Sequence, residues 1–256
     1  MPRNSVQLTP DELVSTIRRS QLPTLLVEGD DDIVVFRKLE ERHADISLSL
    51  MQSGGRASLL KVFERKNEMA NINIGFIADL DSWIVQGVPD HYQSASLIFT
   101  NGYSIENDMF SDGDLINMIS DNRRPAFMQE LTNFIEFFAL ELDRYLRGEA
   151  PNLDIHINAV LDEPGYREAR MVLSEGENYP VQLQQRIQDD FAKLVRGKNL
   201  LQLAIRHLTE NGPALHPLNV LLMVAHRKGP ALSRIFDAVA AIFQQQKIDD
   251  PDQRCI

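Results

Sequence analysis

The stretch TLLVEGDDDIVVF, residues 24–36, decides the interpretation of the first half of the chain. It begins with an apolar run, stops at Glu28 and Gly29, continues with three aspartates and then becomes apolar again. A short apolar run that ends at glycine is typical of a buried strand. Aspartates favour the first turn of a helix because the helix dipole is positive there. We therefore predict a strand over 24–29 that leads directly into a helix over 30–43.

Strand and helix patterns then alternate through the first hundred residues. The amphipathic segment 57–70 predicts a helix, and SGGR at 53–56 predicts the turn before it. Further strands are predicted over 45–52, 72–81 and 94–100. Such alternation is typical of a parallel sheet that is flanked by helices.

After residue 110 the pattern becomes mainly helical. The longest helix is predicted over 125–148, whereas LDIHINAVL at 153–161 alternates like a strand. We therefore predict an α/β domain over 1–110, with a mainly helical extension over 111–256.

The composition limits the classes of protein to consider. Apolar runs such as NVLLMVA at 219–225 are far too short to span a bilayer, and the first residues lack the apolar core of a signal peptide. The single cysteine, Cys255, excludes an internal disulfide. We therefore expect a cytoplasmic protein that does not bind membranes.

Acidic side chains follow two of the predicted strands. Glu28 ends the first strand, and Asp79 and Asp81 end the third. The carboxyl ends of parallel strands meet at one edge of a sheet, and residues two apart on an extended backbone point to the same side. Three convergent carboxylates need a cation to remain ionised, and a hard divalent ion suits oxygen ligands. The pattern therefore predicts a Mg²⁺ site, with Mn²⁺ as the alternative ion.

These motifs resemble a known fold family. LLVEGDDD at 25–32, GFIADLDS at 75–82 and the intervening SGGR resemble the TOPRIM fold of nucleases, primases and topoisomerases. NGYSIENDMF at 101–110 and VRGKNLLQL at 195–203 are similar to segments of a bacterial subgroup related to OLD-type (overcoming lysogenization defect) nucleases. That subgroup includes AriB, the effector of the PARIS anti-phage system.

The resemblance implies a Mg²⁺-dependent endonuclease that acts as a toxin in anti-phage defence. It also implies a tRNA substrate and control by a partner ATPase of the ABC/AAA type. We expect a homodimer once the protein is free of that partner. The alternatives are an OLD-like DNA nuclease and a non-catalytic TOPRIM-like scaffold or sensor that binds an ATPase.

The resemblance also assigns roles to individual residues. Glu28 is the expected general base and a metal ligand, and the other expected ligands are Asp79, Asp81 and Glu106. Tyr103 and Asn107 are expected to shape the site. Glu106 has the alternative role of a capping acid at a helix start.

Positive side chains are concentrated late in the chain. The window 191–234 contains seven Lys and Arg residues and one acid, although the whole chain carries a net charge of −11. A surface of this kind attracts phosphates, with a solvated basic helix face as the alternative. Lys198 is expected to stabilise transition-state charge and is a predicted catalytic residue. The predicted nucleic-acid contacts are Arg56, Arg196, Lys198 and Arg206.

Other enzymes that use paired aspartates fit the sequence less well. Haloacid-dehalogenase phosphatases need D-x-D-x-T/V on the first strand, but Trp83 occupies the last position and two strands precede the motif. A metal-dependent glycosyltransferase would leave Glu28-Gly29 without a role. AKLVRGKN at 192–199 lacks the first glycine and the Ser/Thr of a phosphate-binding loop, so a partner must supply any ATPase activity.

Overall fold

The computed structural model describes residues 7–209, 215–227 and 229–249. The chain forms two compact units. The sheet unit comprises 1–79, 88–100 and 228–256, and the helical unit comprises 80–87 and 101–227. This division differs from the single cut predicted at residue 110, because the chain enters the helical unit twice and later returns to the sheet unit.

The sheet unit is built on four parallel strands in the order β2-β1-β3-β4. Their bounds are Thr24–Val27 (β1), Ser49–Gln52 (β2), Ile74–Ala78 (β3) and Leu97–Phe99 (β4). All residues of β1 and β3 are buried, as expected of central strands that are covered on both faces. The predicted α/β class and parallel sheet are therefore confirmed.

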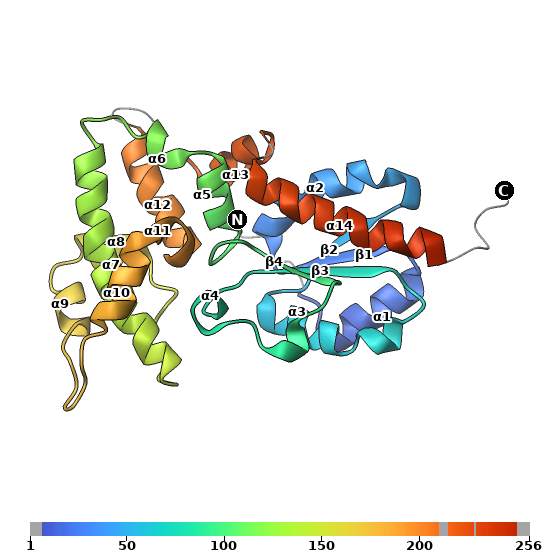
Figure 1. Ribbon diagram of the computed structural model, residues 1–256, viewed down its shortest axis with the longest axis horizontal. Helices are drawn as coiled ribbons and strands as arrows, with labels where there is room; N and C mark the ends of the chain where they lie inside the picture. The colour runs from blue at the N-terminus through green and yellow to red at the C-terminus, as the bar shows by residue number, and fades with distance from the viewer. Residues whose placement is uncertain (1–6, 210–214, 228, 250–256) are drawn as a thin grey trace. The chain divides into compact units, whose positions relative to one another are not determined.

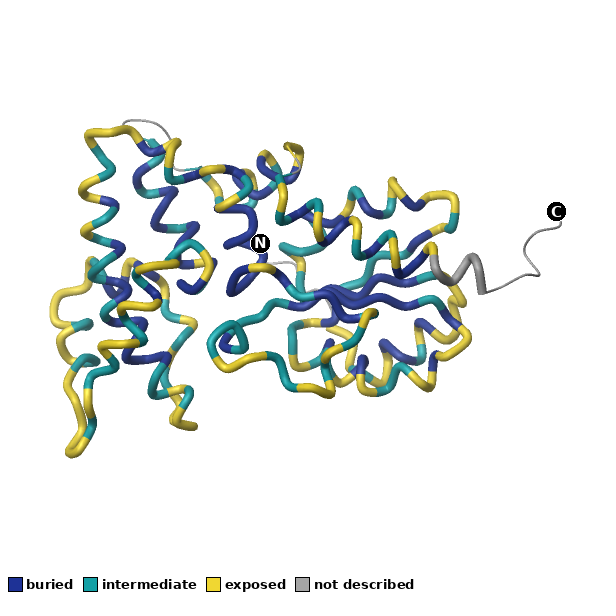
Figure 2. The backbone as a smooth tube through the Cα atoms, in the orientation of Figure 1, coloured by how far each residue is buried: buried dark blue, intermediate teal, exposed yellow. Residues whose placement is uncertain are grey.

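Helices cover both faces of this sheet. In Figure 1, α2 and α14 lie on one face, and α1 and α3 lie on the other. Their bounds are Pro10–Ser20 (α1), Asp30–Arg42 (α2), Arg56–Glu64 (α3) and Pro230–Asp249 (α14). Short 3-10 turns lie at Ala44–Ile46, Lys66–Met69 and Asp90–Tyr92. Figure 2 shows the buried strands between the partly exposed helices.

Local sequence signals explain where these helices start. Thr9 and Glu12 form the reciprocal capping box at the start of α1. At the start of α2, the Gly29 N–H donates to Asp32 Oδ2 at 2.8 Å. The aspartates after Glu28 therefore mark a helix start, as the sequence predicts.

The helix α14 comes from the last part of the chain but packs directly on the sheet. Gly75 in β3 permits close approach, because a Cβ there would lie 3.4 Å from Ile242 Cδ1 and 3.2 Å from Leu25 Cδ1. Phe236 of α14 packs against Phe36 of α2, with ring centroids 6.5 Å apart. This helix therefore completes the core on one face of the sheet.

The helical unit is organised around one long helix, α7 (Arg124–Leu146). Its buried side includes Phe134 and Phe138, whose rings stack with centroids 5.9 Å apart. The preceding helices are α4 (Trp83–Gln86), α5 (Ile105–Asp112) and α6 (Leu115–Met118). The following helices are α8 (Ile157–Asp162), α9 (Tyr166–Arg170), α10 (Val181–Asp189), α11 (Phe191–Leu194), α12 (Gly197–Leu208) and α13 (Pro217–Ala225). The described residues contain no helix with both the length and the apolar character needed to cross a membrane.

The predicted strand over 153–161 is wrong. Residues Ile157–Asp162 form α8, and His156 caps this helix because its Nδ1 accepts the Asn158 N–H at 3.1 Å. The buried residues of this helix are Ile157, Ala159 and Val160.

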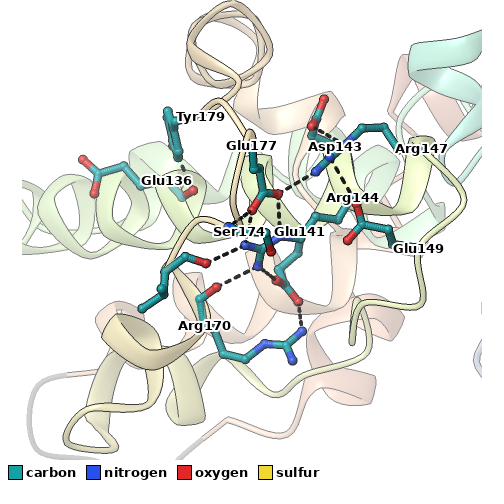
Figure 3. Close-up of polar contacts among 11 residues, drawn as sticks. Glu136, Glu141, Asp143, Arg144, Arg147, Glu149, Arg170, Ser174, Glu177 and Tyr179 are labelled. Atoms are coloured by element: carbon teal, nitrogen blue, oxygen red, sulfur yellow. Dashed lines mark hydrogen bonds and ion pairs between the residues drawn. The ribbon is translucent and has the colours of Figure 1, made fainter.

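A buried ion-pair cluster attaches the loop 171–180 to α7 (Figure 3). Arg144 donates to Glu177 through Nε and Nη2, both at 2.8 Å, and Arg147 donates to Glu177 at 2.6 Å. Glu141, whose side chain is 1% exposed, accepts hydrogen bonds from Arg144 and Arg170. The pKa of Glu177 is held well below its usual range, chiefly by the Arg144 hydrogen bonds and then by the Ser174 N–H. Glu177 is therefore ionised at neutral pH, and its bonds to Arg144 and Arg147 hold the loop in place.

Candidate functional site: the carboxyl edge of the sheet

Two of the predicted site residues meet at the carboxyl edge of the sheet. Strands β1 and β3 are parallel neighbours, so the residues that follow them lie side by side. The Asp79 backbone N–H donates to Glu28 Oε1 at 2.8 Å. The structure therefore brings together two acids that are separated by 51 positions in the sequence.

A glycine turn lies at the same edge. The Ser53 N–H donates to the Val27 carbonyl, and the Gly55 N–H donates to the Glu28 carbonyl, both at 2.8 Å. Gly54 and Gly55 have φ values of 81° and 116°, which favour glycine. This turn directly precedes α3 and fixes where the helix starts. It thereby fixes the position of Arg56, the first residue of α3.

Asp81 does not continue the strand, which corrects the prediction of an extended backbone. Strand β3 ends at Ala78, and Asp81 has a φ of 47° in the left-handed region. Its N–H donates to the Tyr103 carbonyl at 2.7 Å within the helical unit. The side-chain direction of Asp81 therefore does not follow from strand alternation.

The segment around Glu106 forms a buried helix start. Ser104 is the N-cap of α5, and its N–H donates to Asn107 Oδ1 at 3.0 Å. Glu106 is 3% exposed, and its Oε2 accepts the Ser104 hydroxyl at 2.5 Å. The capping role left open for Glu106 thus belongs to Ser104 and Asn107, while Glu106 is oriented by the cap hydroxyl.

Asn107 ties this helix start to a segment almost ninety residues away. Its Nδ2 donates to the carbonyls of Ala192 at 2.8 Å and Val195 at 2.9 Å. The Tyr103 N–H donates to the Lys193 carbonyl at 2.7 Å. Tyr103 is 5% exposed, and burial raises the pKa of its hydroxyl. Asn107 and Tyr103 therefore position backbone segments, a role that the YSIEN motif alone does not indicate.

Two further residues, Asp108 and Gly197, stabilise the same junction, and no role for either was predicted from the sequence. Asp108 accepts the N–H groups of Asn101 at 2.9 Å and Gly102 at 2.8 Å. Gly197 opens α12 so close to α5 that an added Cβ would overlap Ser104 Oγ and Asn107 Oδ1. Lys198 follows Gly197, so this contact sets the position of its backbone. Gly197 could have been identified from the sequence as a residue with a packing role, because it interrupts an otherwise helical pattern.

Three of the seven cations in the predicted basic window 191–234 pair with acids from outside the window. Arg196 pairs with Asp154 at 2.8 Å, and Lys193 lies 3.6 Å from Asp190. Arg206 contacts Asp162 at 2.7 Å and Glu130 at 3.2 Å. The hydrogen bonds from Arg206 lower the pKa of Asp162. Arg196 and Arg206 therefore have structural partners that would compete with a phosphate.

The acidic side chains at the carboxyl edge of the sheet carry oxygen atoms, the type of donor that binds a hard cation. Glu28 and Asp79 supply carboxylate oxygens, the ligands that Mg²⁺ prefers. Within the described ranges, however, no group of three or more His, Cys, Asp or Glu side chains is arranged to hold a metal ion. The structure thus brings two acids together, and the four-acid metal site stays a prediction.

No protein-family model matches the chain, and no curated protein matches it significantly. The resemblance to TOPRIM nucleases rests on the motifs quoted above.

Proposed function

We propose that this chain is a Mg²⁺-dependent endonuclease of the TOPRIM type and the effector of a two-component anti-phage defence system. Its proposed substrate is tRNA, and its proposed partner is an ATPase that holds it inactive until infection. The observation that carries the nuclease proposal is the Glu28–Asp79 hydrogen bond at the shared carboxyl edge of β1 and β3. The partner, the substrate and the defence role rest on the resemblance alone.

In this proposal Glu28, Asp79 and Asp81 hold the ion. Asp79 and Asp81 are two residues apart, so their Cα atoms are separated by about 7 Å at most, whatever their orientation. Bound Mg²⁺ would neutralise a phosphodiester and lower the pKa of an attacking water. Glu106 is the fourth candidate, and its tight bond to Ser104 makes it the ligand with the least support.

The residues of the chain would then divide the chemical work. Glu28 Oε1 accepts the Asp79 N–H, which orients the carboxylate that would take the proton. Water adds to phosphorus as one ester bond to oxygen breaks. The proton leaves the water for Glu28, and the departing oxygen is protonated from solvent. The Lys198 ammonium would stabilise charge on the phosphoryl oxygens.

The deciding experiment is the sequencing of RNA and DNA ends after the chain is expressed with its neighbouring ATPase and the system is triggered by phage. Discrete new ends in tRNA, absent in Glu28→Gln and present in Glu41→Gln, would support the proposal. Glu41 is a matched control because it is an exposed glutamate on α2. Scattered DNA breaks would indicate an OLD-like DNA nuclease.

A binding-only scaffold is the second candidate. It is favoured by the lack of a three-acid metal group within the described ranges and by the paired state of Arg196 and Arg206. No new RNA or DNA ends, together with stable capture of the ATPase, would establish this alternative.

A further inference from the structure

A cleft of about 620 Å³ lies within the helical unit. Three amide side chains line it: Asn101, Gln182 and Gln185. Two cations, Arg186 and Lys193, and two acids, Asp189 and Asp190, complete its polar lining. Ile84 and Leu194 supply apolar surface. The volume is typical of small-ligand sites that combine apolar walls with a few placed polar groups.

Hydrogen bonds to backbone groups hold the walls of this cleft in place. Asn101 lies on the segment whose N–H groups are fixed by Asp108. Lys193 is fixed at its carbonyl by the Tyr103 N–H at 2.7 Å. Arg186 Nη2 donates to the Ile84 carbonyl at 3.2 Å, which joins α10 to the segment 80–87. The cleft is thus assembled before any ligand arrives, and its ligand would bind without ordering the walls first.

The charges of the cleft balance. The two cations are offset by the two acids, and Lys193 lies 3.6 Å from Asp190. Asp189 accepts a hydrogen bond from Gln185 at 2.7 Å. A phosphate would meet both carboxylates, so the lining favours an uncharged, planar group with hydrogen-bonding edges.

We propose that this cleft binds an unpaired nucleobase that carries an exocyclic amino group. This inference rests on the proposed function, because it assumes a nucleic-acid substrate. Amide side chains recognise base edges through paired donors and acceptors, and carboxylates accept hydrogen bonds from exocyclic amino groups. An amino-bearing base in a single strand can enter a concave cleft, whereas a base within a duplex is held in its stack. Uracil lacks the amino group and is the base that the cleft should disfavour.

The test uses the full chain and short, labelled single-stranded RNAs made of A, C or U alone. Binding is measured by fluorescence anisotropy with a metal chelator present, so that no cleavage occurs. The wild type should bind the A or C oligonucleotides about tenfold more tightly than the U oligonucleotide. The double variant Gln182→Ala/Gln185→Ala should reduce that preference to about twofold or less. Gln129→Ala removes an exposed amide from α7 of the same unit and should keep the wild-type preference.

Three results would contradict the proposal that the cleft binds an amino-bearing base. These are equal binding of the three oligonucleotides by the wild type, no binding of any of them, or an unchanged preference in a folded double variant. Circular dichroism checks that the double variant is folded. If the double variant does not fold, Gln182→Glu replaces it in the assay, because this substitution keeps the shape of the side chain but adds a negative charge. Base-selective binding without nucleic-acid cleavage in the cell would reject the nuclease and retain the cleft. Nucleic-acid cleavage without base-selective binding would retain the nuclease proposal and reject the cleft proposal.

Discussion

The carboxylates of the ion-pair cluster in the helical unit contact arginines, whereas the described contact of Glu28 in the sheet unit is with a backbone amide. Glu141 is buried between Arg144 and Arg170, and it joins α7 to the end of α9. Glu28 accepts the Asp79 N–H, and it joins the ends of two strands. The first arrangement fixes helices by charge pairing. The second orients a carboxylate at an edge where parallel sheets bind ligands.

We therefore expect substitutions at the sheet edge to lower activity and substitutions in the ion-pair cluster to lower stability. The largest effect is expected at the sheet edge. Glu28→Gln should lower the rate of nucleic-acid cleavage by about 10²–10⁴-fold, because it removes the proposed base and metal ligand. Its thermal midpoint should stay near that of the wild type, since a glutamine oxygen can still accept the Asp79 N–H. Single-turnover cleavage assays and a melting curve measure the two quantities, and a full-rate Glu28→Gln enzyme would contradict the assignment.

The opposite pattern is expected at Glu141. Glu141→Ala leaves Arg144, which is 12% exposed, and Arg170 without a shared buried carboxylate. The free energy of unfolding should fall by about 3 kcal/mol. Urea titration of Glu149→Ala provides the control, because Glu149 is half exposed and its pair with Arg147 should contribute about 0.5 kcal/mol or less. Equal losses in both variants would show that burial does not distinguish these pairs.

Gly197 tests whether the junction between α5 and α12 is as tight as the contacts indicate. Gly197→Ala should cost about 1–3 kcal/mol, because its Cβ would overlap Ser104 Oγ and Asn107 Oδ1. Gly176→Ala meets no atom within 4 Å, so it should lose only about 1 kcal/mol from its φ of 78°. Chemical denaturation compares the two variants. An unaffected Gly197→Ala protein would mean that the two helix starts are further apart.

The smallest effect concerns the acid sensitivity of the helical unit. The folded-state pKa of Glu177 is depressed by the Arg144 hydrogen bonds, so its contribution to stability is present above the unfolded value of about 4.3. That contribution is lost as the pH falls through the folded-state pKa. Glu177→Gln should therefore be less stable than the wild type at pH 7, with a difference that shrinks below about pH 4. Glu175→Gln, an exposed neighbour, should match the wild type throughout, and a difference independent of pH would exclude a charge effect.

The sequence predicted the two central strands well because β1 and β3 are short apolar runs that an acid follows directly. It also predicted the meeting of Glu28 and Asp79, since parallel strands place their ends at one edge. It did not predict the turn at Asp81, whose positive φ depends on a contact with Tyr103. Nor did it predict that Arg206 is paired, because its partner Asp162 lies 44 residues away on another helix. Local patterns report on local structure, and these pairings are set by helix packing.

The position of α14 also bears on the order in which the protein is made. The helical unit is complete once residue 227 has left the ribosome, but the sheet lacks the helix that covers β3 and β4 until residues 230–249 follow. Because domains generally fold as units during synthesis, we expect the helical unit to fold first and the sheet unit last. If the carboxyl edge of the sheet is the harmful part of the molecule, a translating ribosome would carry it in an unfinished form. Synthesis itself would then delay toxicity until α14 has been made and can cover the sheet.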